Sequence, residues 1–412
     1  MVFFKAFFLK SNDNSVLDFE SLCFLGFVAT LPFPVRYNSL FIVALGVSWI
    51  VNKRYVQAFR LLKNSMIFQA IVVFVFLMAC SLLYTENRKV GLEALEAKLY
   101  LLFLPILLGG LEISVRLRNL AVRTFIYSMV VASLYSVVST ISYYKIDFTD
   151  WSYFSWVITD TLGLSSTHYA MYIVFALLFC IIGYFEWRLI HPIVTIFSCL
   201  YLLVFLALIS SRMPIALFVV SITLYAGMYT VRAHGRLRWL LISFVLTIYA
   251  TVGILSLTVP YLRDRIKQVV ESTEPDPRYF ITTASFQIIR DNWMLGVGLG
   301  DVQSSLNQQY RLIEFKEGLE NEYNTHNDWT NVLLIGGVPA FIALLVVFLG
   351  CIKLAIKHPD PFKWIYLVVY VIAMQTETFF NRNKGVLLFT FLLVLFFLNR
   401  SFIQQVGKND HV

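Results

Sequence analysis

The sequence predicts an all-α polytopic membrane protein of about 12 transmembrane helices, with one long helical loop on the outer side between spans 9 and 10. The first observation behind this prediction is composition: 58% of the 412 residues are apolar, only 14% are charged, and the mean hydropathy is +0.72. Soluble domains carry about 25% charged residues. The second observation is that the apolar residues form long runs separated by short polar connections. Soluble, disordered and fibrous classes are therefore excluded.

The spans follow from the length of these apolar runs. A helix needs roughly 20 mostly apolar residues to cross about 30 Å of hydrocarbon. The runs lack the two-residue alternation of membrane β-strands and are longer than such strands. The predicted spans, of which the second and the last are short, are 20–35, 38–52, 65–84, 98–115, 120–143, 166–187, 192–209, 213–231, 239–259, 327–351, 364–380 and 385–399.

The positions of Lys and Arg orient these spans. Eighteen of the 33 fall in the connections of one side, and eight fall in the short connections of the other side. The richer side is the cytoplasmic one, so both termini are expected inside and the loop 260–326 outside. The chain then divides into spans 1–9 (1–259), the outer loop (260–326) and spans 10–12 with a cytoplasmic tail (327–412). Only His168 and His326 reach the outer face.

The remaining composition gives no sign of nucleic-acid or metal chemistry. The net charge of +8 comes from short clusters between apolar runs, which fits topology-setting charges better than a nucleic-acid surface. All five cysteines lie inside apolar runs without a CxxC pair, so they are expected to be small buried apolar residues. No removable signal peptide is expected, because no small-residue cleavage site follows a short apolar stretch.

The outer loop is predicted to be mostly helical. Apolar residues recur at helical spacing over 262–270, which indicates a short amphipathic helix suited to a membrane surface. Asp276 and Pro277 have the cap and first-turn chemistry of a helix that runs to about Arg290. The following GxGxG run at 296–300 is expected to be a tight turn between helices. It lacks the βαβ context and the Gly-Lys-Ser/Thr of nucleotide loops.

Three arginines are candidate phosphate ligands on the outer face. Arg212 sits at the tightest outer turn, flanked by serines, and a guanidinium can hold a phosphate through two hydrogen bonds. The alternative is interfacial anchoring by a snorkelling side chain. Arg278 lies in the first turn of its predicted helix, where a docked anion would offset its repulsion from the helix dipole; an ordinary surface role is equally compatible. Arg88, beside Lys89, is a less specific outer cation.

Two histidines and one glutamate are candidates for proton transfer. His326 begins span 10 at the interface, and an imidazole can accept a proton from a sugar hydroxyl near neutral pH; the alternative is a structural interfacial residue. His168 is the rival, with a structural role favoured. Glu377, near the outer end of span 11, is expected to form a structural ion pair with Arg382 or Lys384.

Metal catalysis has little support in the sequence. The predicted outer face has no DxD or HExxH motif. Its acidic residues are spaced as on a solvated face; they are Glu314, Glu317, Glu320 and Glu322. No metal site and no cofactor are therefore expected.

Five motifs occur in order along 205–345. They are Ser-Ser-Arg-Met-Pro (210–214), Asp-Pro-Arg (276–278), Ile-Arg-Asp-Asn-Trp-Met-Leu-Gly-Val-Gly-Leu-Gly (289–300), Thr-His-Asn-Asp-Trp (325–329) and Leu-Ile-Gly-Gly-Val-Pro (334–339). Each is loose alone, but their order on one side of the membrane is fairly specific. The chain resembles the O-antigen ligase/polymerase superfamily, which consists of bacterial polytopic membrane glycosyltransferases.

This resemblance implies a multi-pass protein of the bacterial inner membrane with a periplasmic helical loop and a periplasmic active site. The donor would be a glycan on undecaprenyl pyrophosphate, the acceptor a sugar hydroxyl of lipid A-core or another glycan, and no metal would be needed. By the same resemblance, Arg212 and Arg278 would hold the donor pyrophosphate, and His326 would activate the acceptor. Direct displacement would invert the anomeric centre.

The sequence departs from the family pattern at two places, and both leave the subfamily open. Met213-Pro214 follows the first arginine, and Gly-Gly-Val-Pro stands where Glu-Xaa-Gly is frequent after His-Asn. An O-antigen ligase and a repeat-unit polymerase of O-antigen or exopolysaccharide are therefore both retained. A polytopic transporter is a more distant alternative, because the sequence shows no internal repeat and no long connection between spans 6 and 7. A scaffolding protein would not need the outer arginines and histidine.

Overall fold

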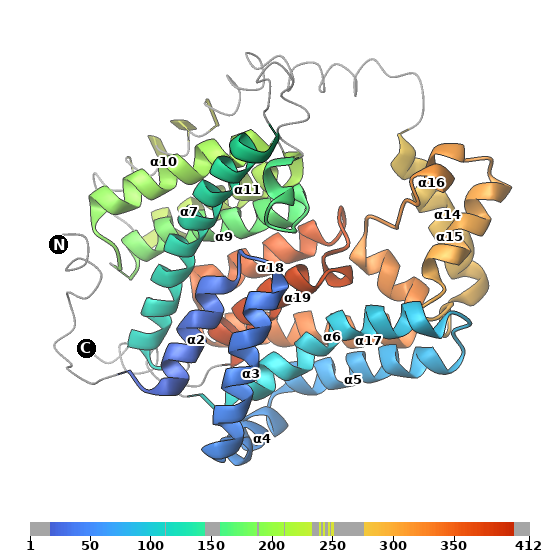
Figure 1. Cartoon of the computed structure of the whole chain (residues 1–412), viewed down its shortest axis with the longest axis horizontal. Helices are drawn as coiled ribbons and strands as arrows, with labels where there is room; N and C mark the ends of the chain where they lie inside the picture. The colour runs from blue at the N-terminus through green and yellow to red at the C-terminus, as the bar shows by residue number, and fades with distance from the viewer. Residues whose placement is uncertain are drawn as a thin grey trace.

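The computed structural model describes residues 17–111, 113–144, 157–187, 189–209, 211–232 and 276–398, together with isolated positions in 239–250. Within these residues every regular element is a helix, as expected (Figure 1). The elements are α2 (Phe19–Thr30), α3 (Val35–Val51), α4 (Tyr55–Lys63), α5 (Met66–Cys80), η1 (Ser81–Leu83), α6 (Arg88–Gly109), α7 (Val115–Tyr144), α9 (Ser166–Phe185), α10 (Pro192–Ile209), α11 (Arg212–Arg232), α14 (Pro277–Asn292), α15 (Val302–Leu312), α16 (Lys316–Glu320), α17 (Asp328–Lys357), α18 (Pro361–Ala373), η2 (Phe379–Asn381), α19 (Asn383–Leu393) and η3 (Val394–Leu398).

Ten of the predicted spans coincide with apolar helices. Six helices are long and apolar enough to cross a membrane: Met66–Leu83, Val115–Ser142, Ser166–Phe185, Pro192–Ile209, Arg212–Tyr229 and Asp328–Lys357. Four shorter apolar helices match the first two and last two predicted spans: Phe19–Thr30, Val35–Val51, Pro361–Ala373 and Asn383–Leu398. The predicted span 98–115 falls largely on α6, and most of 239–259 lies outside the described residues. The helical class is confirmed, while the count of 12 stays a prediction.

At two predicted boundaries near a charged residue the helix ends elsewhere, and an N-terminal cap explains the first of these differences. Helix α6 begins at Arg88, well before 98, because the Asn87 side chain caps it by accepting from the Val90 N–H at 3.4 Å. Lys98 therefore lies inside a helix and is buried, where an outer connection was expected. Helix α18 ends at Ala373, so Glu377 lies in the turn that follows the helix. The connection after span 2 also contains α4, a short helix.

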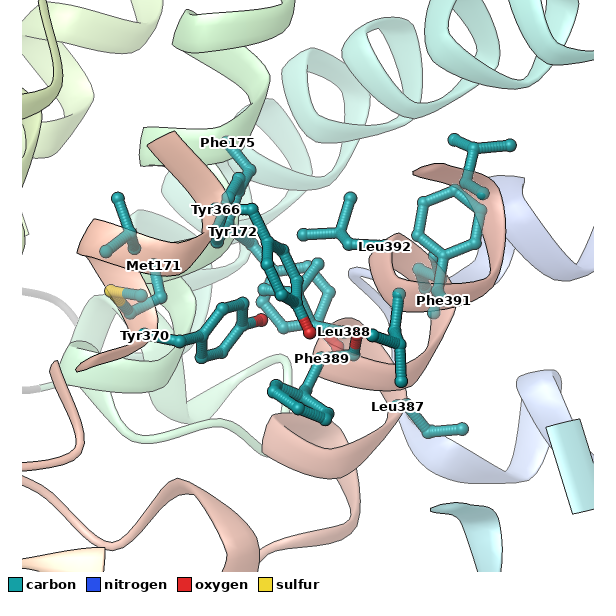
Figure 2. Close-up of a cluster of buried hydrophobic side chains, with 14 of the residues drawn as sticks. Met171, Tyr172, Phe175, Tyr366, Tyr370, Leu387, Leu388, Phe389, Phe391 and Leu392 are labelled. Atoms are coloured by element: carbon teal, nitrogen blue, oxygen red, sulfur yellow. Dashed lines mark hydrogen bonds between the residues drawn. The ribbon is translucent and has the colours of Figure 1, made fainter. Parts of the chain in front are cut away.

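Helix α9 forms the centre of the helical core. Its side chains from His168 to Gly183 are all buried, whereas the membrane-length helices around it leave larger shares of their surfaces exposed. Aromatic rings from α9, α18 and α19 pack together there (Figure 2). The Tyr172 hydroxyl donates to the Lys384 carbonyl at 2.8 Å, and the Tyr366 hydroxyl donates to the Phe389 carbonyl at 3.2 Å. Ring packing and interhelical hydrogen bonds hold such helices together where lipid removes the hydrophobic drive.

Residues 276–326 of the predicted outer loop form a small helical unit at one end of the molecule (Figure 1), and we name it the outer helical unit after that predicted location. Asp276 caps α14 as predicted, accepting from the Arg278 N–H at 2.8 Å, and the helix runs from Pro277 to Asn292. One face of α14 packs against α15 and the residues beyond it in a separate apolar cluster, which contains Ile281, Ala284, Ile288, Leu306, Tyr310, Phe315 and Leu334. The amphipathic helix predicted at 262–270 lies outside the described residues.

The glycine run after α14 is the predicted tight turn, and it also covers a break in α17. The backbone of α17 leaves helical geometry at Gly337 (φ 62°), and Pro339 follows. The Val338 N–H donates outside the helix to the Trp293 carbonyl at 2.9 Å, and Pro339 has no N–H to donate. The Leu334 and Ile335 carbonyls therefore lose the partners that a regular helix would give them.

Both of these carbonyls are satisfied by the glycine turn. The Val297 N–H donates to Leu334 O at 2.7 Å, and the Gly298 N–H donates to Ile335 O at 3.1 Å. Gly296 and Gly298 have φ of 70° and 95°, in the region that favours glycine. A Cβ on Gly337 would collide with the Met294 carbonyl. The glycine turn at 296–300 and the glycine pair at the α17 kink are thus joined by backbone hydrogen bonds, and the close contact leaves no room for a Cβ on Gly337.

The same turn is fastened to the corner between α5 and α6. The Leu299 N–H donates to Ser81 Oγ at 3.1 Å, and the Tyr84 hydroxyl donates to the Leu295 carbonyl at 2.5 Å. The carboxylate of Asp301 accepts from the Glu86 and Asn87 N–H groups at 2.7 and 3.0 Å. The outer helical unit is therefore fixed to α5, α6 and α17.

Substituting Ala for Gly337 should destabilise the protein by about 1–3 kcal/mol, because the new Cβ meets the Met294 backbone and a positive φ is strained. Thermal unfolding in detergent measures this loss. Gly227→Ala in α11 is the matched control, since nothing lies within 4 Å of its added Cβ. Equal melting temperatures for the two variants would contradict the proposed role of the kink.

Candidate functional site

The four residues singled out from the sequence all lie at N-terminal ends of helices. Arg88 is the first residue of α6, Arg212 is the first of α11, and Arg278 is the second of α14. His326 directly precedes Asn327, the cap of α17. Helix N-termini carry partial positive charge and favour anions. Cations at these positions add to that potential, so the arrangement suits an anionic ligand.

The three arginines are exposed, and their side chains make no hydrogen bond or ion pair with other described residues. The described contacts also give no hydrogen bond or ion pair that joins these arginines to one another or to His326. No described residue therefore occupies their guanidinium donors. That Arg88, Arg212 and Arg278 bind one common ligand stays a prediction.

His326 has a carboxylate partner in the structure. Its Nδ1 lies 3.4 Å from Oε1 of Glu377, and the two side chains are 34% and 19% exposed. The same Glu377 oxygen accepts from the Thr378 N–H at 3.1 Å. The His326 N–H donates to Asn324 Oδ1 at 2.8 Å, while its own backbone has a left-handed φ of 43°. This sparsely populated conformation is a local strain of the kind found at functional sites.

Opposing effects set the charge of Glu377. Burial alone would raise the pKa of its carboxyl, but the hydrogen bond and charge of His326 and the Thr378 N–H together lower the pKa below its ordinary value of 4.5. The carboxylate is therefore charged at neutral pH. In this geometry it engages Nδ1 of His326 and leaves Nε2 as the nitrogen that can accept a proton.

The prediction that Glu377 pairs with Arg382 or Lys384 is wrong. The ammonium of Lys384 instead donates to the Leu31 carbonyl at 2.7 Å and to Oδ1 of Asn38. Among the described residues, the ion pair of Glu377 is with His326. His326 precedes α17 and Glu377 follows α18, so no local spacing in the sequence could reveal the contact. The only signal was a carboxylate near the outer end of an apolar span.

His168, in the first turn of α9, packs against the turn that carries Glu377 and is buried. Its Nδ1 is 2.6 Å from Ser165 Oγ, and its ring centroid is 5.0 Å from that of Phe379. Its Nε2 has no hydrogen-bond partner among the described residues. Two histidines expected on one face thus both contact residues 377–379, but only His326 is exposed enough to meet a large substrate. This burial favours a structural role for His168.

Other candidate chemistry finds no support within the described part of the chain. No group of three His, Cys, Asp or Glu residues there could hold a metal ion. The five cysteines are free thiols, three of them buried and two partly buried.

Comparison with known proteins gives one family. Residues 197–345 match the family model described as O-antigen ligase. The matched segment contains Arg212, Arg278 and His326, together with the glycine turn and the α17 kink. Curated protein sequences give no match to this chain.

The ionised Glu377 should stabilise the fold at neutral pH and lose that effect in acid. Because its folded pKa lies below the ordinary value of 4.5, the stabilisation is present above that pH and disappears as pH falls through the folded pKa. Melting temperatures of wild type and Glu377→Gln, measured from pH 7 to about pH 3.5, should converge towards the acid end. A constant difference across that range would contradict this prediction.

Proposed function

We propose that this O-antigen ligase-like chain is a multi-pass glycosyltransferase of the bacterial inner membrane. It transfers a glycan from an undecaprenyl-pyrophosphate donor to a sugar hydroxyl on the periplasmic side. The family match over 197–345 and the apolar helices support the class of protein. The observation that carries the chemistry is the contact between His326 and Glu377.

In this mechanism His326 is the general base. Its Nε2 takes the proton of the acceptor hydroxyl, and the hydroxyl oxygen attacks the anomeric carbon of the donor sugar. The bond from that carbon to the pyrophosphate oxygen breaks, its electron pair leaves with the pyrophosphate, and the configuration inverts. Glu377 holds the ring orientation through Nδ1 and stabilises the imidazolium that forms, as a carboxylate does behind other catalytic histidines.

The exposed arginines bind the leaving group. Breaking the glycosidic bond places negative charge on the pyrophosphate, and fixed guanidinium groups stabilise that charge. Arg212 and Arg278 are the main ligands in this proposal, with Arg88 as a further cation. Because each lies in the first turn of a helix, the helix N-terminus reinforces its attraction for phosphate.

The acceptor separates a ligase from a repeat-unit polymerase, and the ligase is the first candidate because the matching family carries that description. Gel analysis of cell-surface glycans in a deletion strain distinguishes the two. Loss of all glycan on lipid A-core supports the ligase. Loss of long chains with single repeats retained supports the polymerase. Substrate uptake without glycan transfer would support the transporter alternative.

His326→Ala should lower kcat by about 10²–10⁴-fold, the usual contribution of a general base. The melting temperature should fall about as far as in Glu377→Gln, because both variants lose the same ion pair, so kcat is compared at equal amounts of folded protein. The measurement is glycan transfer by purified protein in nanodiscs. His168→Ala is the comparison variant. Because His168 is buried, this variant should lower the melting temperature and change the kcat of the folded protein little. Full activity of His326→Ala would exclude the proposed base.

Arg278→Lys should keep the charge and lose the two-pronged hydrogen bonding of the guanidinium. The expected result is at least about a tenfold drop in kcat/KM for the lipid-linked donor, which equals about 1.4 kcal/mol. Arg290→Lys is the matched control, because Arg290 is an exposed arginine on the same helix that pairs with Asp291 at 3.3 Å. Near-normal turnover of Arg278→Lys would argue against phosphate clamping by this residue.

A further inference from the structure

Buried polar side chains lie against the turn that carries Glu377. Lys98 comes from α6, and Asp328 and Asn331 come from the first turn of α17. Only 2%, 0% and 3% of these residues is exposed, respectively. Asn381, the last residue of η2, is exposed, and its Oδ1 accepts hydrogen bonds from this group. Neither Lys98 nor Asp328 has a role in the glycosyl transfer proposed above.

These residues hold the turn at both of its ends, one end through the backbone and the other through side chains. At the start of the turn, the backbone N–H of Asp328 donates to the Met374 carbonyl at 2.7 Å. At its end, the Lys98 ammonium donates to the Phe380 carbonyl at 2.9 Å and to Asn381 Oδ1 at 3.2 Å. The Asp328 carboxylate accepts from the Phe380 N–H at 3.2 Å. Glu377 lies between these two attachments.

Asn331 and Asn381 complete the network. The Asn331 side-chain amide donates to Asn381 Oδ1 at 3.0 Å, so this oxygen receives hydrogen bonds from both Asn331 and Lys98. Residues of α6 and of α17 therefore converge on the backbone and side chains of 380–381. Asp328 follows His326 by two positions, so the same anchor fixes both members of the His326–Glu377 pair.

Stability alone does not account for a lysine and an aspartate at this place. Removing two charges from water is expensive, and well-packed apolar residues of similar volume often serve a fold equally well. Ionisable groups buried in membrane proteins are usually paired and functional. Here the lysine and the aspartate both bind one short turn, and that turn carries the side chain of Glu377.

We propose that Lys98 and Asp328 are positioning residues for the general base. They fix the turn 374–381 so that the Glu377 carboxylate meets Nδ1 of His326 and Nε2 faces the acceptor. This inference rests on the proposed function and adds residues to the same site. Loss of the anchor shifts Glu377 and lowers kcat, while the KM for the donor, which depends on the arginines, stays near its wild-type value.

The test is a double-mutant cycle with Lys98→Met and His326→Ala in nanodiscs. Misplacement of a catalytic group by about 1 Å can reduce a rate about 10²-fold, so Lys98→Met should lower kcat about 10–100-fold in the wild-type background. In the His326→Ala background it should cause no further loss, because the base on which it acts is gone. Lys98→Arg should recover part of the rate.

Lys363→Met is the matched control for the loss of a buried lysine. Lys363 is 1% exposed, and its ammonium donates to the His358 carbonyl at 2.9 Å, near the opposite end of α18 from the turn. This variant should lower the melting temperature, and any change in kcat should be the same in both backgrounds. Where Lys98→Met fails to accumulate, Asn381→Ala replaces it, since Asn381 is exposed and accepts from Lys98.

Each outcome decides the inference. Coupling between Lys98 and His326, without coupling between Lys363 and His326, supports positioning. Equal losses from Lys98→Met in both backgrounds, or an increase in donor KM without a decrease in kcat, overturn it and leave the proposed function intact. Wild-type activity of His326→Ala overturns the proposed function and this inference together.

Discussion

The hydrogen bonds between the α17 kink and the glycine turn fix the helical unit of residues 276–326 to α17. A break in an apolar helix exposes carbonyls that lipid cannot satisfy. Here the diverted Val338 N–H and the missing Pro339 N–H free the Leu334 and Ile335 carbonyls, and the turn after α14 supplies both donors. These hydrogen bonds attach the outer helical unit to α17, and this unit carries Arg278 on its first helix.

The helices were predictable because their sequence signals are local. The predicted boundaries were wrong where a residue distant in the sequence determines where the helix begins. Apolar length identified ten apolar helices, and the Asp276–Pro277 cap identified the start of α14. Hydropathy placed Lys98 at the outer end of the predicted span 98–115, because a charge normally ends a span. In the fold, the Phe380 carbonyl and Asn381 satisfy its ammonium, so the helix extends past it. That partner comes from a segment far away in the sequence.

The candidate site was predictable to the same extent. Loop charges assigned His168 and His326 to one face, and in the structure both contact residues 377–379. Burial then separated them, which no sequence pattern could do. The partner of Glu377 was predicted wrongly because neighbours in sequence seemed the natural cations, whereas α17 brings His326 into contact with it. Chain spacing says little about pairs made between helices.

The candidate arginines and the candidate base differ in whether a carboxylate lies beside them. The outer arginines have no carboxylate partner among the described residues, so their charge is available for a phosphate. The histidine has one, and the turn that holds this carboxylate is fixed by a buried lysine and aspartate. A leaving group needs uncompensated positive charge, whereas a base needs one ring nitrogen occupied so that the other is free. In the proposed glycosyl transfer, the exposed arginines would bind the ligand and the buried Lys98 and Asp328 would orient the base, so the two requirements are complementary.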